Sequence, residues 1–177
     1  KTMSEEAQHA GIKIVTGDTK VVDKGKCDKL FINTSGVGVL PENRKNIGSG
    51  REIKTGDKII INGSIGQHGM AIMAARNDLN IIASIVSDCA SLNGIIAEVL
   101  DAKIKVNFMR DATRGGLGTV LAELAKNKKF GVRIEEEKLT VENGVRGMCE
   151  LLGFDPLYVA NEGKVIMVVP AEDAPRV

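Results

Sequence analysis

The string Met109-Arg110-Asp111-Ala112-Thr113-Arg114-Gly115-Gly116 stands between a predicted strand and a predicted helix. Before it, Ile104, Val106 and Phe108 alternate with polar residues, which is typical of a strand with one covered face. After it, apolar residues recur three and four positions apart over 117–125, which predicts an amphipathic helix packed on a sheet. This junction therefore indicates layers of sheet and helix, an α+β fold.

The same periodicities predict the elements on either side. Strands are expected over 12–16, 29–33, 57–62, 131–134 and 164–169. Helices are expected from Gln67 to about Asn77, over 91–101, and after Thr140 as N-cap as far as Gly153. Residues 36–56 are rich in glycine and charge, which marks a linker or domain crossover. We therefore expect a sheet-and-helix layer from about residue 51, preceded by the end of another β-containing unit.

The composition describes a globular chain with balanced charge. Of 177 residues, 43% are hydrophobic and 27% are charged, which excludes a disordered tail and a fibrous repeat. The net charge of +1 argues against a protein that coats nucleic acid or an anionic membrane. No apolar run approaches the ~20 residues of a membrane span. Cys27, Cys89 and Cys149 share no metal-ligand spacing, so we expect reduced thiols in a cytoplasmic protein.

Two explanations fit residues 109–116. Two Arg, one Asp, one Thr and two adjacent Gly at a helix start suit a polyphosphate, because the helix dipole, free N–H groups and guanidinium groups favour negative charge. The Asp is then free to bridge the phosphates through a metal ion. The structural alternative is an Arg–Asp pair that caps the helix, with Thr113 as N-cap.

Three further strings have both a functional and a structural explanation. In Thr16-Gly17-Asp18-Thr19-Lys20 the Asp can hold Mg²⁺ and the Lys can offset oxyanion charge, or the string is an ordinary turn. The junction over 62–69 suits either a phosphate at a helix start or a tight turn without ligand. In Asn161-Glu162-Gly163 a carboxylate amid apolar residues suits a general base, or it is a surface turn residue. Ser87-Asp88 is interpreted as an N-cap of the helix over 91–101.

Together these strings resemble the HypE family of hydrogenase maturation proteins. That family belongs to the superfamily of aminoimidazole ribonucleotide synthetase, selenophosphate synthetase and thiamine-monophosphate kinase. The resemblance is carried by residues 14–22, 31–34, 62–69, 87–89, 109–116 and 149–164, and spans nearly the whole chain. It implies an α+β fold in which 1–45 ends an N-terminal PurM-like α/β domain that forms dimers and binds ATP. Residues 46–177 would then be most of a PurM-like C-terminal α/β domain, with a mixed sheet and helices on one side.

The resemblance also implies a function in [NiFe]-hydrogenase maturation. Such proteins are cytoplasmic homodimers that use ATP and Mg²⁺ to dehydrate a carbamoylated C-terminal cysteine to a thiocyanate, the source of the cyanide ligands of the iron. The implied partners are a HypF-like carbamoyltransferase and a HypC–HypD-like complex, with no nucleic acid and no membrane. Two alternatives stay open: an ATP-dependent small-molecule kinase or synthetase of the same superfamily, and a non-catalytic docking module for maturation partners.

The residue roles that the resemblance implies cover both halves of the chain. Glu162 would be the general base, and Lys20 would activate the carbamoyl oxygen. Asp18 and Asp111 would hold Mg²⁺. The nucleotide would be bound by Asp18, Thr19, Asp111, Thr113, Arg114, Gly115, Gly116 and Asn161.

The chain departs from the family pattern in places. Gln67 stands where the family usually has an acid, and Ala112 where it often has Pro. The family's Pro-Arg-x-Cys ending does not occur here, and none of the three cysteines lies in a terminal tail. We interpret the chain as a fragment lacking the acceptor cysteine, and expect it to hydrolyse ATP negligibly because half of the nucleotide site would lie outside it.

Overall fold

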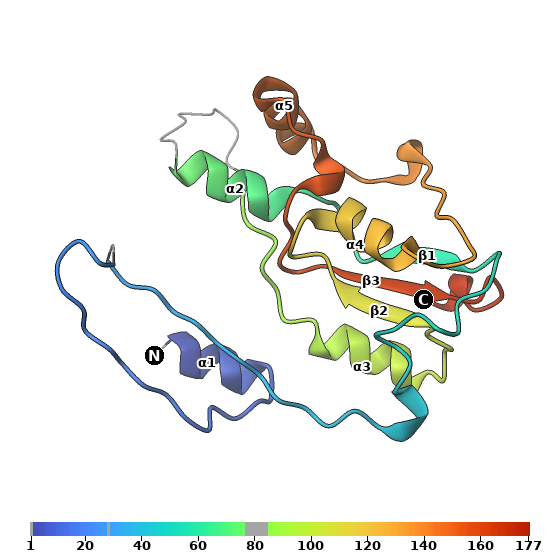
Figure 1. Ribbon diagram of the computed structural model, residues 1–177, viewed down its shortest axis with the longest axis horizontal. Coiled ribbons are helices and arrows are strands. Elements are labelled where there is room, and N and C mark those ends of the chain that lie inside the picture. Colours follow the sequence, from blue (N-terminus) through green and yellow to red (C-terminus); the bar gives the residue numbers. More distant parts are fainter. Residues whose placement is uncertain (1, 28, 77–84) are drawn as a thin grey trace. The chain divides into compact units, whose positions relative to one another are not determined.

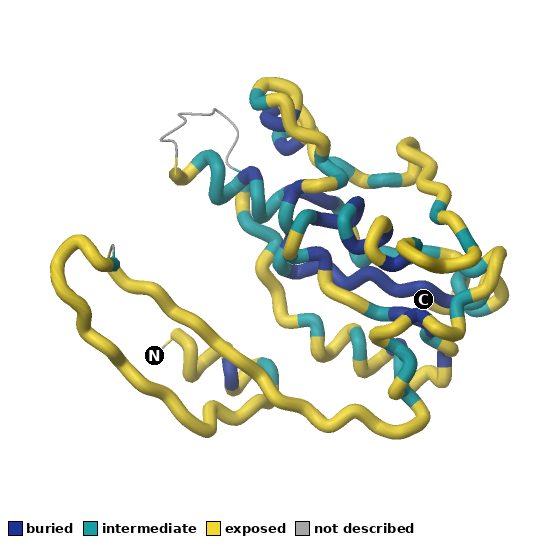
Figure 2. Tube along the Cα trace, in the orientation of Figure 1, coloured by how far each residue is buried: buried dark blue, intermediate teal, exposed yellow. Residues whose placement is uncertain are grey.

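The computed structural model describes residues 2–27, 29–76 and 85–177, which form two units, Lys1–Glu42 and Asn43–Val177. The first unit holds helix α1 (Thr2–His9), and the extended chain that follows it is exposed (Figure 2). The strands predicted over 12–16 and 29–33 are not formed among the described residues, because no described strand pairs with these segments. That the first 45 residues end a separate domain stays a prediction.

The second unit is built on a three-stranded sheet. Its strands are β1 (Lys58–Ile61), β2 (Phe108–Asp111) and β3 (Val165–Val169), in the order β1-β3-β2 (Figure 1). Met167 of β3 lies opposite Ile60 on one side and Met109 on the other, and both pairings are antiparallel. The mixed sheet that we expected is therefore wrong for the described strands, because β3 returns between β1 and β2 and runs opposite to both.

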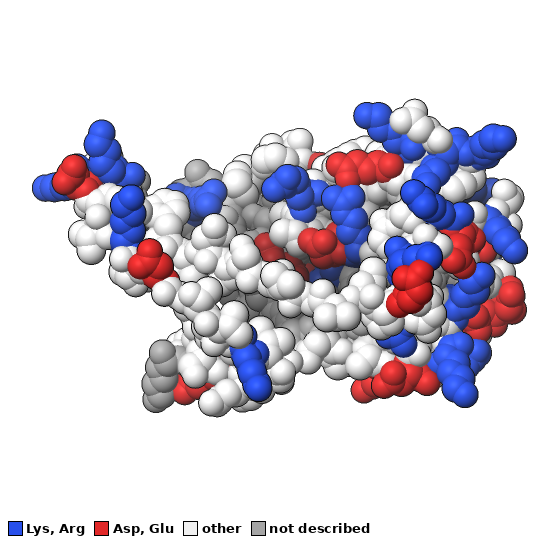
Figure 3. Space-filling view, turned by 60° about the horizontal axis from the view of Figure 1, so that its bottom comes forward, with Lys and Arg blue, Asp and Glu red and all other residues white. Residues whose placement is uncertain are grey.

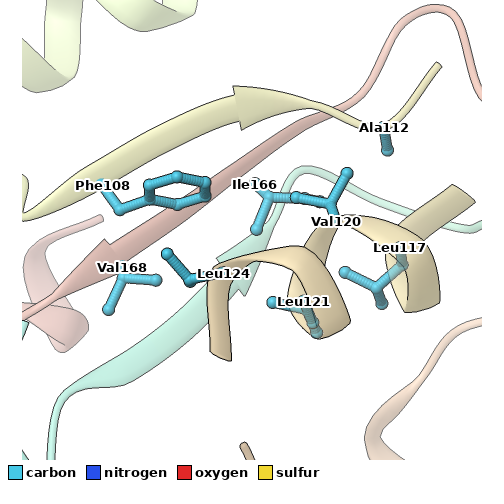
Figure 4. Close-up of a cluster of buried hydrophobic side chains, with 8 residues drawn as sticks. All are labelled: Phe108, Ala112, Leu117, Val120, Leu121, Leu124, Ile166 and Val168. Atoms are coloured by element: carbon cyan, nitrogen blue, oxygen red, sulfur yellow. The ribbon is translucent and has the colours of Figure 1, made fainter. Parts of the chain in front are cut away.

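Helices cover both faces of this sheet. Helix α4 (Gly116–Ala125) covers one face, and helix α3 (Asn93–Asp101) covers the other (Figure 1). Leucines of α4 pack on Phe108, Ile166 and Val168, as Figure 4 shows. Val99 of α3 packs in a second cluster with the alternate residues of β3, which are Val165, Met167 and Val169. The expectation of helices on one side only is wrong, because all five residues of β3 are apolar and both of its faces need cover.

A second helix pair adjoins this layer. Helix α2 (Gln67–Arg76) contacts helix α5 (Asn143–Leu152), and their cluster joins Met70 to Val145. The predicted end of α2 at Asn77 lies outside the described residues. Gly153 ends α5 in the left-handed conformation (φ 72°), as predicted, whereas the N-cap is Glu142 and not Thr140. The Thr140 carbonyl instead accepts a hydrogen bond from the Ile65 N–H (3.0 Å).

The remaining elements are short 3₁₀ turns and surface loops. The turns are η1 (Glu42–Arg44), η2 (Glu136–Lys138), η3 (Pro156–Tyr158) and η4 (Ala174–Arg176). The strand predicted over 131–134 is absent.

On the face drawn in Figure 3, basic and acidic side chains are interspersed. None of the helices in the described part of the chain has the length and apolar character needed to cross a membrane. The α+β class is confirmed.

The packing of α5 predicts which thiol reacts first. Burial raises the pKa of the Cys149 thiol, and the nearby Asp155 and Glu150 carboxylates raise it further. A raised pKa lowers the thiolate fraction at neutral pH, and Cys149 is also only 1% exposed, whereas Cys89 is exposed. We expect iodoacetamide to modify Cys89 in the folded chain and Cys149 only after unfolding in urea, as measured by peptide mass spectrometry. Equal labelling of both cysteines before unfolding would contradict this packing.

Candidate functional site

The buried side chain of Asn161 joins three of the motifs. Its Oδ1 accepts a hydrogen bond from the Gly66 N–H (2.7 Å), and its Nδ2 donates to the Val159 carbonyl (2.9 Å). Its backbone N–H donates to the Ala112 carbonyl (3.3 Å). Asn161 is 0% exposed, so its amide is used within the chain. The 62–69 junction and the 109–116 string are therefore both held against the segment that precedes β3.

A second amide extends this connection. Asn62, just after β1, donates from Nδ2 to the Gly163 carbonyl (3.0 Å) and accepts from the Val165 N–H at Oδ1 (2.7 Å). Both bonds continue the pairing of β1 and β3 beyond the end of the ladder. The backbone on either side of Glu162 is thus held by side-chain amides.

The start of α4 lies directly against η3. Gly116 has φ 64°, and a Cβ on it would lie 2.5 Å from the Leu157 carbonyl oxygen. Only glycine allows both this backbone conformation and this approach. Gly115 is the N-cap of α4, and among the described residues no side chain caps the helix. The first N–H groups of α4 therefore lack a side-chain cap.

The structural explanation of the 109–116 string does not hold. Arg110 pairs with Glu123 on α4 and not with Asp111, and Thr113 is not the N-cap. Asp111 and Arg114 are exposed. A helix start without a side-chain cap, next to an exposed guanidinium and an exposed carboxylate, has the features that favour phosphate groups and a hard cation.

Asp88 and Lys164 form a buried ion pair beside Glu162. Their Oδ2 and Nζ atoms are 3.1 Å apart, and the side chains are 2% and 9% exposed. Asp88 also accepts the Glu162 N–H at Oδ1 (3.1 Å). The predicted N-cap role of Ser87-Asp88 is wrong, because α3 begins after Leu92 and Asp88 is used in this ion pair. Its carboxylate holds the Glu162 backbone instead.

The Glu162 side chain faces a histidine. Its Oε1 lies 3.7 Å from His68 Nε2, and the two side chains are 36% and 21% exposed. His68 Nδ1 is 2.9 Å from Ser87 Oγ. The surroundings of Glu162 are therefore more polar than the apolar run in the sequence indicated. The carboxylate is partly open to solvent, which a base that meets a substrate requires.

Gln67 makes bonds that an acid at this position would lose. Its Nε2 donates to Glu142 Oε1 (2.8 Å), and its Oε1 accepts from Ser64 Oγ (3.0 Å). A carboxylate at position 67 would face the Glu142 carboxylate. Glu142, the N-cap of α5, therefore suits a glutamine at position 67 and not the acid that the family usually has there.

The candidates Asp18, Thr19 and Lys20 belong to the first unit, whereas the other candidates belong to the second. There, Asp18 Oδ1 accepts the Thr19 N–H (2.8 Å), and all three residues are exposed. Sequence reasoning missed His68 and Lys164. Neither residue belongs to a spaced motif, since His68 is a single His in a glycine-rich string and Lys164 is a single Lys before a strand.

Comparison with known proteins shows the family to which the chain belongs. Residues 54–177 match the family described as AIR synthase related protein, C-terminal domain. The chain belongs to this family. It is 49% identical over 173 residues to carbamoyl dehydratase HypE of Rhodobacter capsulatus, which covers 98% of this chain and 50% of that protein. The PurM-like C-terminal domain that we expected is confirmed.

Two crystal structures of HypE proteins are similar over almost all of the chain. One is HypE in complex with ATP, with a TM-score of 0.91 and 43% identity over 99% of this chain and 52% of that one. The other is a HypE–HypF complex, with a TM-score of 0.88 and 47% identity over 99% of this chain and 57% of that one. The resemblance to HypE is confirmed, and the chain spans about half the length of the curated relatives it matches.

The close packing at Gly163 can be tested by a single methyl group. A Cβ on Gly163 would lie 1.9 Å from the Asp88 carbonyl oxygen, so backbone must move. We expect Gly163→Ala to lower the free energy of unfolding by ~1–3 kcal/mol, as measured by urea denaturation. Gly147→Ala is the matched control, because a Cβ there meets open space within α5. A Gly163 variant as stable as the Gly147 variant would disprove the close approach.

The buried ion pair predicts a larger effect. Asp88→Asn keeps the shape of the side chain but leaves the Lys164 ammonium buried without its counter-charge, so we expect a loss of ~3–5 kcal/mol in unfolding free energy. Glu135→Gln is the control, because its pair with Lys138 is exposed and should change stability by less than ~1 kcal/mol. Equal losses of unfolding free energy in the two variants would show that Asp88 does not stabilise the buried Lys164 ammonium.

Proposed function

We propose that the full-length protein carrying this chain is an ATP-dependent carbamoyl dehydratase of [NiFe]-hydrogenase maturation. The main support is the setting of Glu162, whose backbone is held by Asp88 and whose carboxylate is partly exposed beside His68. The similar proteins support the same function, since they are named carbamoyl dehydratase and one HypE structure contains ATP.

The start of α4 is the proposed phosphate site. Its N–H groups without a side-chain cap and the exposed Arg114 would bind the triphosphate, with the Thr113 hydroxyl as a further donor. Thr19, on the first unit, is proposed as a further nucleotide contact. Gly115 and Gly116 would let the backbone approach the phosphates. Asn161 would act indirectly, since its amide holds Gly66 and is fully buried.

Asp18 and Asp111 are the proposed Mg²⁺ ligands. Both are exposed carboxylates, and Mg²⁺ is usually bound through one or two carboxylates together with substrate phosphates. Within the described ranges, no three His, Cys, Asp or Glu side chains gather as a metal cage. When bound, the ion would neutralise phosphate charge. Each carboxylate is of the kind that binds Mg²⁺ together with ATP phosphates.

The reaction needs a group for each change in bonding. The carbamoyl oxygen attacks the γ-phosphorus of ATP, ADP leaves, and one nitrogen proton passes to solvent, which gives an O-phosphorylated intermediate. Lys20 would offset the charge on that oxygen. Glu162 would then take the remaining nitrogen proton as the C–O bond breaks, the nitrogen electron pair forms the nitrile, and phosphate leaves. The product is a thiocyanate on the terminal cysteine.

The partners follow from the same proposal. We propose a cytoplasmic homodimer that receives the carbamoyl group from a HypF-like carbamoyltransferase and passes the cyano group to a HypC–HypD-like complex. The HypE–HypF complex among the similar structures supports the first partner. We also propose that the 177-residue chain alone hydrolyses ATP negligibly.

Removal of the base tests this function directly. In the full-length protein, we expect Glu162→Gln to leave ATP binding within twofold of the unchanged protein, because the side chain keeps its size. The same substitution should slow thiocyanate formation ~10²- to 10⁴-fold, because the nitrogen proton loses its acceptor. The measurement is mass spectrometry of the C-terminal peptide after incubation with the carbamoyl donor and ATP.

Glu150→Gln is the control, since Glu150 lies exposed on α5. It should leave the loss of water from the carbamoylated peptide unchanged. Normal loss of water in the Glu162 variant would overturn the base assignment.

A further inference from the structure

Four side chains form a line that leads away from the proposed base. Glu162 Oε1 lies 3.7 Å from His68 Nε2, and His68 Nδ1 lies 2.9 Å from Ser87 Oγ. Ser87 Oγ lies 3.2 Å from Cys89 Sγ, and Cys89 Sγ is also 3.8 Å from His68 Nδ1. Three separate segments supply these residues: the first turn of α2, the chain before α3, and the loop before β3.

The Ser87 hydroxyl allows two arrangements of the line. Because it has one hydrogen, it donates either to His68 Nδ1 or to Cys89 Sγ, while it accepts the Cys89 N–H (3.2 Å) in both. In the first arrangement, His68 carries its hydrogen on Nε2 and faces Glu162 as a donor. In the second, Nδ1–H donates to Ser87 and the Nε2 lone pair faces Glu162. The second arrangement makes His68 a proton acceptor for that carboxyl group.

We propose that His68 receives the proton that Glu162 removes from the substrate nitrogen. This inference rests on the proposed function and adds a proton-relay role to a residue that touches the base and not the substrate. In the step, the Glu162 O–H bond breaks, the His68 Nε2–H bond forms, and Glu162 returns to its carboxylate form. Two nitrogen protons leave in each turnover and the departing phosphate takes up one from solvent, so one proton is released net; His68, which is 21% exposed, passes the second nitrogen proton to solvent.

The charges around the line suit this transfer. Two groups face His68: the Glu162 carboxylate, which lies on the loop before β3, and the Cys89 thiol, which lies on the chain before α3. Asp88, which holds the Glu162 backbone, is itself paired with Lys164. The imidazolium that forms therefore lies next to a carboxylate that has just regained its negative charge.

Substitution of His68 in the full-length protein tests the relay. We expect His68→Gln to slow single-turnover thiocyanate formation ~10- to 100-fold with ATP affinity unchanged, because the glutamine amide does not take up a proton. His68→Ala should be equally slow and should recover at least part of its rate in added imidazole. Ser87→Ala should show a smaller loss and Ser87→Thr, which restores the hydroxyl, close to the normal rate. His9→Gln on α1 is the matched control.

Each result separates this inference from the proposed function. Slow His68 variants with imidazole recovery support the relay, because a purely structural role would not respond to imidazole. A normal rate in His68→Gln, or a loss in His68→Ala that imidazole does not reverse, overturns the relay. If Glu162→Gln is inactive in the same assay, the proposed function stands despite that failure. If Glu162→Gln is fully active, the base assignment fails and the relay fails with it, whereas the proposed function itself fails if the unchanged full-length protein forms no thiocyanate.

Discussion

The buried amide of Asn161 is the interaction on which the candidate site depends. A buried amide without partners costs ~1–3 kcal/mol for each unmet group, so the chain around Asn161 must supply a donor and an acceptor. The Gly66 N–H and the Val159 carbonyl do so, and the Asn161 backbone adds a bond to Ala112. These bonds hold the starts of α2 and α4 to one segment before β3.

The position of Glu162 follows from that constraint. As the next residue after Asn161, it has its N–H bonded to Asp88, and Asp88 is paired with Lys164 away from water. The carboxylate then extends toward His68 with part of its surface exposed. A buried ion pair whose partners are both held adds little net stability, but it makes the location of each charge specific. The proposed base is thereby positioned by its neighbours and not by its own packing.

The sheet provides the rigid support for these contacts. All residues of β3 are buried, with alternate side chains packed under α3 and under α4. Glu162 lies just before the most buried strand, and the 109–116 string joins β2, the neighbour of that strand, to α4. Functional groups supported by packed strands and helices are held more precisely than groups on unsupported loops, which suits both of these positions.

The sequence by itself determined the local elements of the second unit. Helices α2 to α5, strands β1 and β3 and the Gly153 cap follow from apolar spacing and from the backbone needs of glycine, which act over a few residues. It also indicated Glu162 and the start of α4 as chemical positions. Only the tertiary structure decided that both sheet faces are covered and that Asp88 pairs with Lys164 and does not cap a helix. The contact of His68 with Glu162 was decided in the same way, because distant segments meet only once the core has packed.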